Sequence, residues 1–167
     1  KAVVLRGSDA RLQLAVTGQY TAGQFDGVTA TSMDGLSIPA ASGVDTTALI
    51  VGDYSNGNDG IVMKDSTSVA DMKGQQVNLV ELSVSHYLLA RALESADLAM
   101  TDVRTINTAD ADIAGAFTSP DVTAAVAWNP QVLTMKQEAG AHEVFSSADI
   151  PGEILDLLVV EAATLEA

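Results

Sequence analysis

The pattern of hydrophobic and polar positions changes period most clearly within Val77–Leu93. The run Val77–Val80 holds β-branched residues and no charge, which is typical of a buried strand. Along Val84–Leu93 the apolar residues recur at helical spacing, with Ser83 or Ser85 available as the N-cap. We therefore predict a strand, a tight turn and a helix, and free backbone N–H groups at such a helix start are suited to a small polar ligand.

Short apolar strands alternate with helical segments along the rest of the chain. Because the predicted strands are apolar on both faces, we expect parallel strands with helices on both sides, which is an α/β fold. The turn-rich stretch Asp53–Gly60 separates two halves and predicts two lobes with a cleft. The other predicted strands are Ala2–Leu5, Val28–Thr31, Thr47–Val51, Ile61–Lys64, Val103–Asn107, Val122–Ala127, Val144–Phe145 and Val159–Val160. The other predicted helices are one that ends near Tyr20, Leu36–Ala41 with Pro39 in its first turn, a short one near Val69–Met72, Ile113–Phe117 and Gln131–Glu138.

Candidate ligand-binding residues follow the predicted strands, because ligands of open α/β sheets lie beyond the carboxyl ends of the strands. Trp128 is the only tryptophan and either fills the core or stacks on a planar ligand. Glu81 is either a surface acid or a carboxylate that pairs with a ligand. Asp34, Asp53 and Asp59 read singly as turn or capping residues, but together with Glu81 they would give a cleft a negative potential.

Charge and composition exclude several classes of protein. The net charge is −14, with 22 acidic residues against 8 lysines and arginines, which argues against nucleic-acid binding. The chain has no cysteine, so disulfides and Cys-ligated metals are excluded. No apolar stretch is long enough to span a bilayer, and no signal peptide is visible at Lys1, so we expect a removed signal or a start within a longer chain. No metal or cofactor motif is present, so neither is expected.

Motifs of nucleophilic catalysis are absent as well. The two histidines are His86, in the first turn of the central predicted helix, and His142, which we expect in an exposed loop. His86 is either a capping and packing residue or a ligand contact. An enzyme that uses Glu81 or His86 as acid or base is the rival to a binding protein.

Several segments resemble periplasmic solute-binding proteins of the nitrate/taurine/alkanesulfonate type that serve ABC importers. The general likeness lies in Tyr20–Gly27, Ser32–Asp34 and Ala70–Gln75. A likeness to the subgroup of urea transport binding proteins, linked to urea carboxylase or guanidine use, lies in Asp53–Gly60, Ser83–Leu93, Ala127–Pro130 and Ile150–Ile154.

The resemblance implies a type 2 periplasmic-binding-protein fold of two α/β lobes joined by a hinge, with an incomplete first lobe. Residues 1–55 would form the partial first lobe, 53–60 the hinge, 61–150 the second lobe, and 151–167 the start of the return to the first. The implied ligand-binding residues are Ser32, Asp34, Asp53, Ser55, Glu81, Ser83, Ser85 and Trp128.

The expected function is capture of a small nitrogen-rich solute, such as guanidine or urea, for an ABC permease, without catalysis. The alternative on the same fold is a small anion, such as nitrate, taurine or an alkanesulfonate, held at the helix start by Ser83 and Ser85. The number of carboxylates near that helix start speaks against the anion. A ligand-sensing module of a larger regulator is a third possibility. We expect a monomer in the periplasm or another extracytoplasmic space, either free or lipid-anchored.

Overall fold

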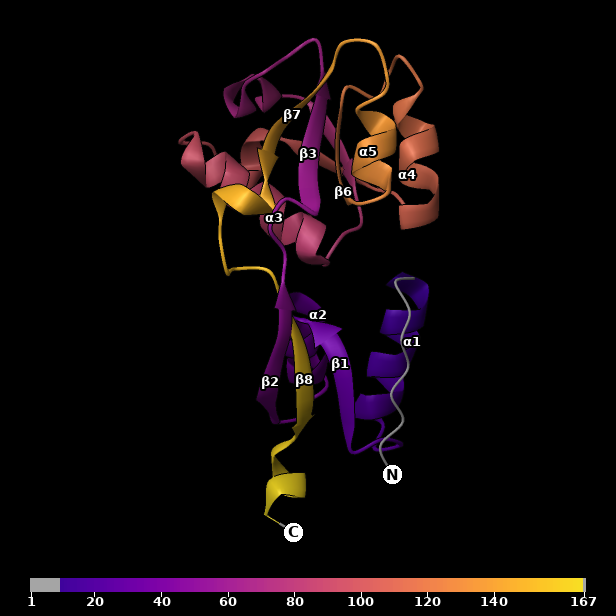
Figure 1. Ribbon diagram of the computed structural model, residues 1–167, viewed down its shortest axis with the longest axis vertical. Helices are drawn as coiled ribbons and strands as arrows, with labels where there is room; N and C mark the ends of the chain where they lie inside the picture. The colour runs from indigo at the N-terminus through magenta and orange to yellow at the C-terminus, as the bar shows by residue number, and fades with distance from the viewer. Residues whose placement is uncertain (1–9, 167) are drawn as a thin grey trace. The chain divides into compact units, whose positions relative to one another are not determined.

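The computed structural model describes residues 10–166 of the chain (Figure 1). The chain divides into two compact units, and each is described by itself below. Unit 1 takes the residues up to Tyr54 and those from Ile154 onward, whereas unit 2 is Ser55–Glu153. The chain therefore passes between the units twice, after Tyr54 and after Glu153.

Every residue of unit 2 is described, and its five-stranded sheet has the order β5-β4-β6-β3-β7. Strand β4 runs parallel to β5 and β6, whereas β3 is antiparallel to β6 and β7. The carboxyl ends of β4, β5, β6 and β7 and the amino end of β3 therefore share one edge, which we call the carboxyl edge of unit 2. The strands are β3 Asp59–Lys64, β4 Gln76–Leu79, β5 Arg104–Asn107, β6 Ala124–Trp128 and β7 Ala141–Ser146.

Helices cover both faces of this sheet. Val62 and Ala125 pack against α4 and α5 in one core cluster, together with Phe117 and Met135. Successive strand residues point to opposite faces, and α3 packs against β3 and β6 from the other face (Figure 1). The helices are α3 Val84–Ser95, α4 Asp110–Phe117 and α5 Gln131–Met135, with short 3-10 turns η1 Val69–Met72, η2 Met100–Asp102 and η3 Ser147–Asp149.

Unit 1 contains a three-stranded sheet of order β1-β8-β2 among its described residues, and β8 is antiparallel to both neighbours. The side chain of Tyr20, near the end of α1, is fully buried against Val28, Leu157 and Val159. The elements are α1 Ala10–Thr21, β1 Gly27–Thr31, α2 Ser32–Ala41, β2 Thr46–Tyr54, β8 Leu155–Glu161 and the 3-10 turn η4 Ala162–Leu165.

The expectation of parallel strands throughout is wrong in both units: in unit 2, β3 is antiparallel to β6 and β7, and in unit 1, β8 is antiparallel to β1 and β2. Strand β8 follows the whole of unit 2 in sequence and enters between β1 and β2 in the opposite direction. The predicted strand Val159–Val160 is the last part of this longer strand. Its partners lie far away along the chain, so local periodicity carries no signal for the direction of pairing.

Three local predictions also differ from the structure. Helix α2 begins at Ser32, since the Thr31 side chain accepts a hydrogen bond from the Asp34 N–H, and Pro39 lies inside the helix. Strand β2 includes the predicted Thr47–Val51 but is exposed along most of its length. The residues Asp53 and Tyr54 belong to β2, and Asp59 and Gly60 belong to β3, so the connection between them is only Ser55–Asn58. The predicted strand Ala2–Leu5 lies outside the described residues.

Tyr20 gives a first testable prediction. Its hydroxyl is buried without a hydrogen-bond partner, and burial, with Glu161 as a smaller cause, raises its pKa to about 12. An unsatisfied buried donor is costly, so Tyr20→Phe should raise the free energy of unfolding by roughly 1 kcal/mol in urea denaturation. The matched control is Tyr87→Phe, because the Tyr87 hydroxyl donates to Glu153 Oε2 at 2.7 Å. That variant should lose stability, and a loss in both variants would contradict the prediction.

Candidate functional site

The carboxyl edge of unit 2 gathers five of the eight expected site residues. Glu81, Ser83 and Ser85 follow β4, Trp128 ends β6, and Ser55 precedes β3. Hydrogen bonds between the loops hold this edge together. The Asn129 N–H donates to the Asn58 carbonyl at 2.9 Å, the Glu81 N–H to Asn107 Oδ1 at 3.1 Å, and the Thr108 N–H to the Leu79 carbonyl at 2.8 Å.

The start of α3 is the best-defined feature of the edge. Ser83 is the N-cap, and its Oγ accepts a hydrogen bond from the Ser85 N–H at 3.1 Å and donates to the Val80 carbonyl at 2.8 Å. Ser85 is fully buried, and its Oγ has no hydrogen-bond partner. The first turn of α3 holds no acidic residue, so no carboxylate in that turn offsets the positive end of the helix dipole.

The turn before α3 is held by His86. The Leu82 N–H donates to His86 Nδ1 at 3.1 Å, so the neutral ring carries its proton on Nε2. Leu82 has a φ of 63° and a side chain that is 75% exposed, an uncommon combination for a large apolar residue. The Glu81 carboxylate turns to β5, where its Oε1 accepts a hydrogen bond from Thr105 Oγ1 at 3.0 Å.

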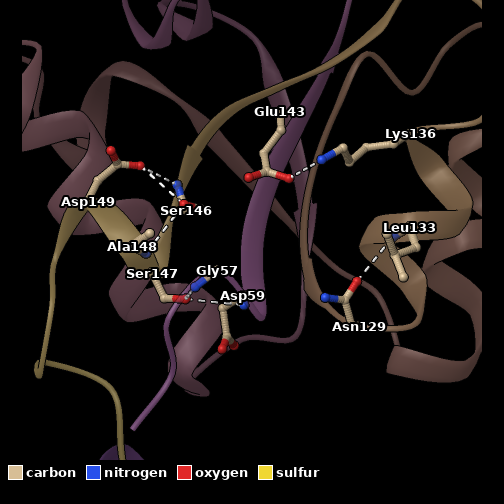
Figure 2. A network of polar contacts seen from close by, with 10 residues as sticks. All are labelled: Gly57, Asp59, Asn129, Leu133, Lys136, Glu143, Ser146, Ser147, Ala148 and Asp149. Atoms are coloured by element: carbon tan, nitrogen blue, oxygen red, sulfur yellow. Dashed lines mark hydrogen bonds and ion pairs between the residues drawn. The ribbon is translucent and has the colours of Figure 1, made fainter.

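A second polar network surrounds Ser147, at the end of β7 (Figure 2). The buried Ser147 Oγ accepts hydrogen bonds from the Gly57 N–H at 2.8 Å and the Asp59 N–H at 3.4 Å. Ser55 Oγ lies 2.7 Å from Ser147 Oγ and also contacts the Asp59 carboxylate. Asp59 in turn is the ladder partner of Trp128, which is half-buried. The first connection between the units is therefore fixed to η3 at its unit 2 end.

The other three expected residues lie in unit 1, at one edge of its sheet. Ser32 Oγ accepts a hydrogen bond from the Leu155 N–H at 3.4 Å. Burial raises the pKa of Asp34, against the opposite effect of its hydrogen bond with Thr31. Asp53 faces Asp156 across the β2–β8 ladder. Burial, and secondly the Asp53 charge, raise the pKa of Asp156.

Sequence reasoning missed several polar residues of these edges. Ser147, Asn107 and Thr108 come from segments that are distant along the chain, and their contacts depend on the order of the strands. A signal did exist for η3, since Ser146 and Asp149 form a capping box three residues apart. No sequence signal marked Asp156, because its position opposite Asp53 depends on the pairing of β2 with β8. His142 lies on β7 rather than in a loop, although it is exposed as expected.

Among residues 10–166, no group of three or more His, Cys, Asp or Glu side chains is arranged to hold a metal ion. None of the helices in the described part of the chain is long and apolar enough to cross a membrane.

The fold is the α/β fold of periplasmic binding proteins. The crystal structure of the periplasmic aliphatic sulphonate binding protein SsuA from Escherichia coli superposes with a TM-score of 0.79 at 24% identity, covering 92% of this chain and 50% of that one. The desulfurization enzyme DSZB shares the fold more distantly, with a TM-score of 0.53 at 15% identity over 95% of this chain and 67% of that one.

The chain belongs to the NMT1/THI5-like family, whose model matches residues 13–166. A curated relative from Escherichia coli (strain K12), named for aliphatic sulfonate binding, is 34% identical over 83 residues, which is 50% of this chain and 26% of the relative. The chain thus spans about half of the SsuA structure, and the match covers about a quarter of the curated relative. The family match and the fold agree with the expected likeness to periplasmic binding proteins, whereas the urea and guanidine subgroup finds no support in these comparisons.

The paired aspartates of unit 1 give a second prediction. Asp53→Asn should raise the free energy of unfolding near neutral pH by roughly 0.5 kcal/mol, because like charges opposite each other in a ladder are destabilising. The raised pKa of Asp156 means that the folded chain binds this proton more readily than the unfolded chain. The stability that protonation of Asp156 contributes to the folded chain is therefore lost as pH rises through the range just above the ordinary aspartate pKa.

Urea denaturation near neutral pH and at about pH 3 measures this effect. The gain in Asp53→Asn should disappear at the lower pH, where Asp156 is protonated in both states. Asp45→Asn is the matched control, since Asp45 is exposed and precedes the same strand. An equal gain in both variants would assign the effect to net charge rather than to the pair.

Proposed function

We propose that the chain is part of an extracytoplasmic solute-binding protein that captures a small sulfonate-type anion for an ABC importer. The start of α3 at the carboxyl edge of unit 2 carries this proposal. The names of SsuA and of the curated relative support it, since both describe binding of aliphatic sulfonates. We further propose a location in the periplasm, since the similar SsuA structure is that of a periplasmic protein.

The electrostatics of unit 2 support an anion over a cation. A helix N-terminus favours negative charge, and the first turn of α3 has no acidic residue of its own. Two carboxylates near this edge are held by hydroxyl groups of other segments of the unit rather than by α3. Glu81 is bonded to Thr105, and the Asp59 carboxylate is bonded to Ser55.

Hydrogen-bond donors at the same helix start support a ligand with several acceptor oxygens. Ser85 Oγ has no partner, and leaving a buried hydroxyl unsatisfied is costly. The proton of neutral His86 on Nε2 is a further donor in the first turn. A sulfonate accepts hydrogen bonds through three oxygens and thus suits such a set better than a cation, which is itself a donor.

A nitrogen-rich ligand such as guanidine or urea is the second candidate. The acidic edge of unit 1 favours it, where burial and the Asp53 charge raise the pKa of Asp156. A bound cation would relieve this repulsion. An enzyme on the same fold has less support, because Glu81 and His86 contact Thr105 and Leu82 rather than each other.

The third prediction concerns ligand binding. Titration of Trp128 fluorescence with ethanesulfonate, taurine, nitrate, guanidinium and urea should give saturable changes with the sulfonates. Ser85→Ala should weaken sulfonate binding about tenfold, the loss of one hydrogen bond to a charged group, and should not lower the unfolding free energy, because the removed hydroxyl has no partner in the chain.

Ser95→Ala is the matched control, because Ser95 lies at the other end of α3 and bonds the Ala92 carbonyl. Its sulfonate affinity should equal that of the unsubstituted chain. Saturation by guanidinium or urea alone would establish the second candidate instead. Turnover of any of these compounds would contradict a role limited to binding.

A further inference from the structure

The first connection between the units contains the only Asn-Gly pair of the chain, Asn56-Gly57. The other four asparagines precede Asp, Leu, Thr and Pro. Asparagine deamidates when the backbone nitrogen of the next residue attacks its side-chain carbonyl carbon. Glycine after asparagine makes this attack easiest, because it has no side chain and tolerates the conformations that the attack requires.

Local geometry leaves the pair accessible. Asn56 is exposed and lies in the bend between β2 and β3. Gly57 has a φ of 84°, and a Cβ added to it would meet no atom within 4 Å. The space on the side-chain side of Gly57 is therefore open.

One contact opposes the reaction. The nitrogen that would attack belongs to Gly57, and its N–H donates to Ser147 Oγ at 2.8 Å (Figure 2). Ser147 is fully buried and is further held by the Asp59 N–H and by Ser55 Oγ. The Gly57 nitrogen must give up this hydrogen bond and its proton before its electron pair can reach the Asn56 carbonyl carbon.

We propose that Asn56 is a site of spontaneous deamidation whose rate is set by the Ser147 hydroxyl. A bond forms between the Gly57 nitrogen and Asn56 Cγ, and the bond from Cγ to Nδ2 breaks. Nδ2 leaves as ammonia with the proton from the Gly57 nitrogen, and a cyclic succinimide remains. One water molecule then opens the ring at either carbonyl, which gives aspartate or isoaspartate.

Both products change the connection Ser55–Asn58. Each adds a negative charge close to the buried Asp59. Isoaspartate also lengthens the main chain by one methylene group between residues 56 and 57, so Ser55 Oγ and the Gly57 N–H no longer keep the spacing with which both meet Ser147 Oγ. Deamidation would thus release the first connection between the units from η3. This inference does not depend on the identity of the ligand.

The experiment follows deamidation of the chain in mildly alkaline buffer, by peptide mass spectrometry and by labelling with isoaspartyl methyltransferase. Asn56 should be the main position that reacts. In Ser147→Ala the rate at Asn56 should rise about fivefold, which corresponds to a lost hydrogen bond of about 1 kcal/mol. The matched control, Ser146→Ala, removes the cap of η3 but leaves the bond to Gly57 in place, so its rate should stay that of the unsubstituted chain.

A second comparison keeps the test decisive if Ser147→Ala does not fold, which circular dichroism reports. The unsubstituted chain should deamidate at Asn56 at least fivefold more slowly when folded than in urea, for the same reason. Equal rates in the folded and unfolded chain would overturn the proposal. Reaction at another asparagine in preference to Asn56, or an unchanged rate in folded Ser147→Ala, would overturn it as well.

Discussion

Strand β8 lies between β1 and β2 and hydrogen bonds to both along most of its length. Its inward residues Leu157 and Val159 also form the core of unit 1 with Tyr20 and Val28. This strand follows unit 2 in sequence, so unit 1 is complete as described only after the chain has returned from unit 2. The long-range pairing therefore determines that the chain passes between the units twice.

The two passages are fixed to unit 2 by different chemistry. Around Ser55–Asn58, neutral and backbone groups converge on the buried Ser147 hydroxyl. At Glu153, the carboxylate accepts hydrogen bonds from Tyr87 and a bidentate pair from Arg91, both on α3. The second contact is charge-assisted, and Arg91 and Tyr87 lower the pKa of Glu153. Helix α3 thus holds both the candidate ligand-binding turn and one of the two connections.

The distribution of carboxylates in the structure bears on which ligand charge each unit favours. Counting acids along the sequence suggested a negative cleft around Glu81, Asp34 and Asp53. In the structure these acids belong to different units, and Glu81 is bonded to Thr105. The first turn of α3, at the carboxyl edge of unit 2, holds no acidic residue, so no acid within that turn offsets the positive end of the helix dipole. The charged groups beside the start of α3, more than the net charge of −14 of the whole chain, determine which ligand charge this helix start favours.

The sequence by itself determined the α/β class, the strand–turn–helix unit at Val77–Leu93 with a serine cap, and the gathering of candidate residues at strand ends. These features depend on periodicity and capping, which act over a few residues. Only the tertiary structure decided the antiparallel direction of β8, the Ser147 network and the opposition of Asp53 and Asp156. Each of these joins residues about a hundred positions apart along the chain, and local patterns carry no information on which strands become neighbours.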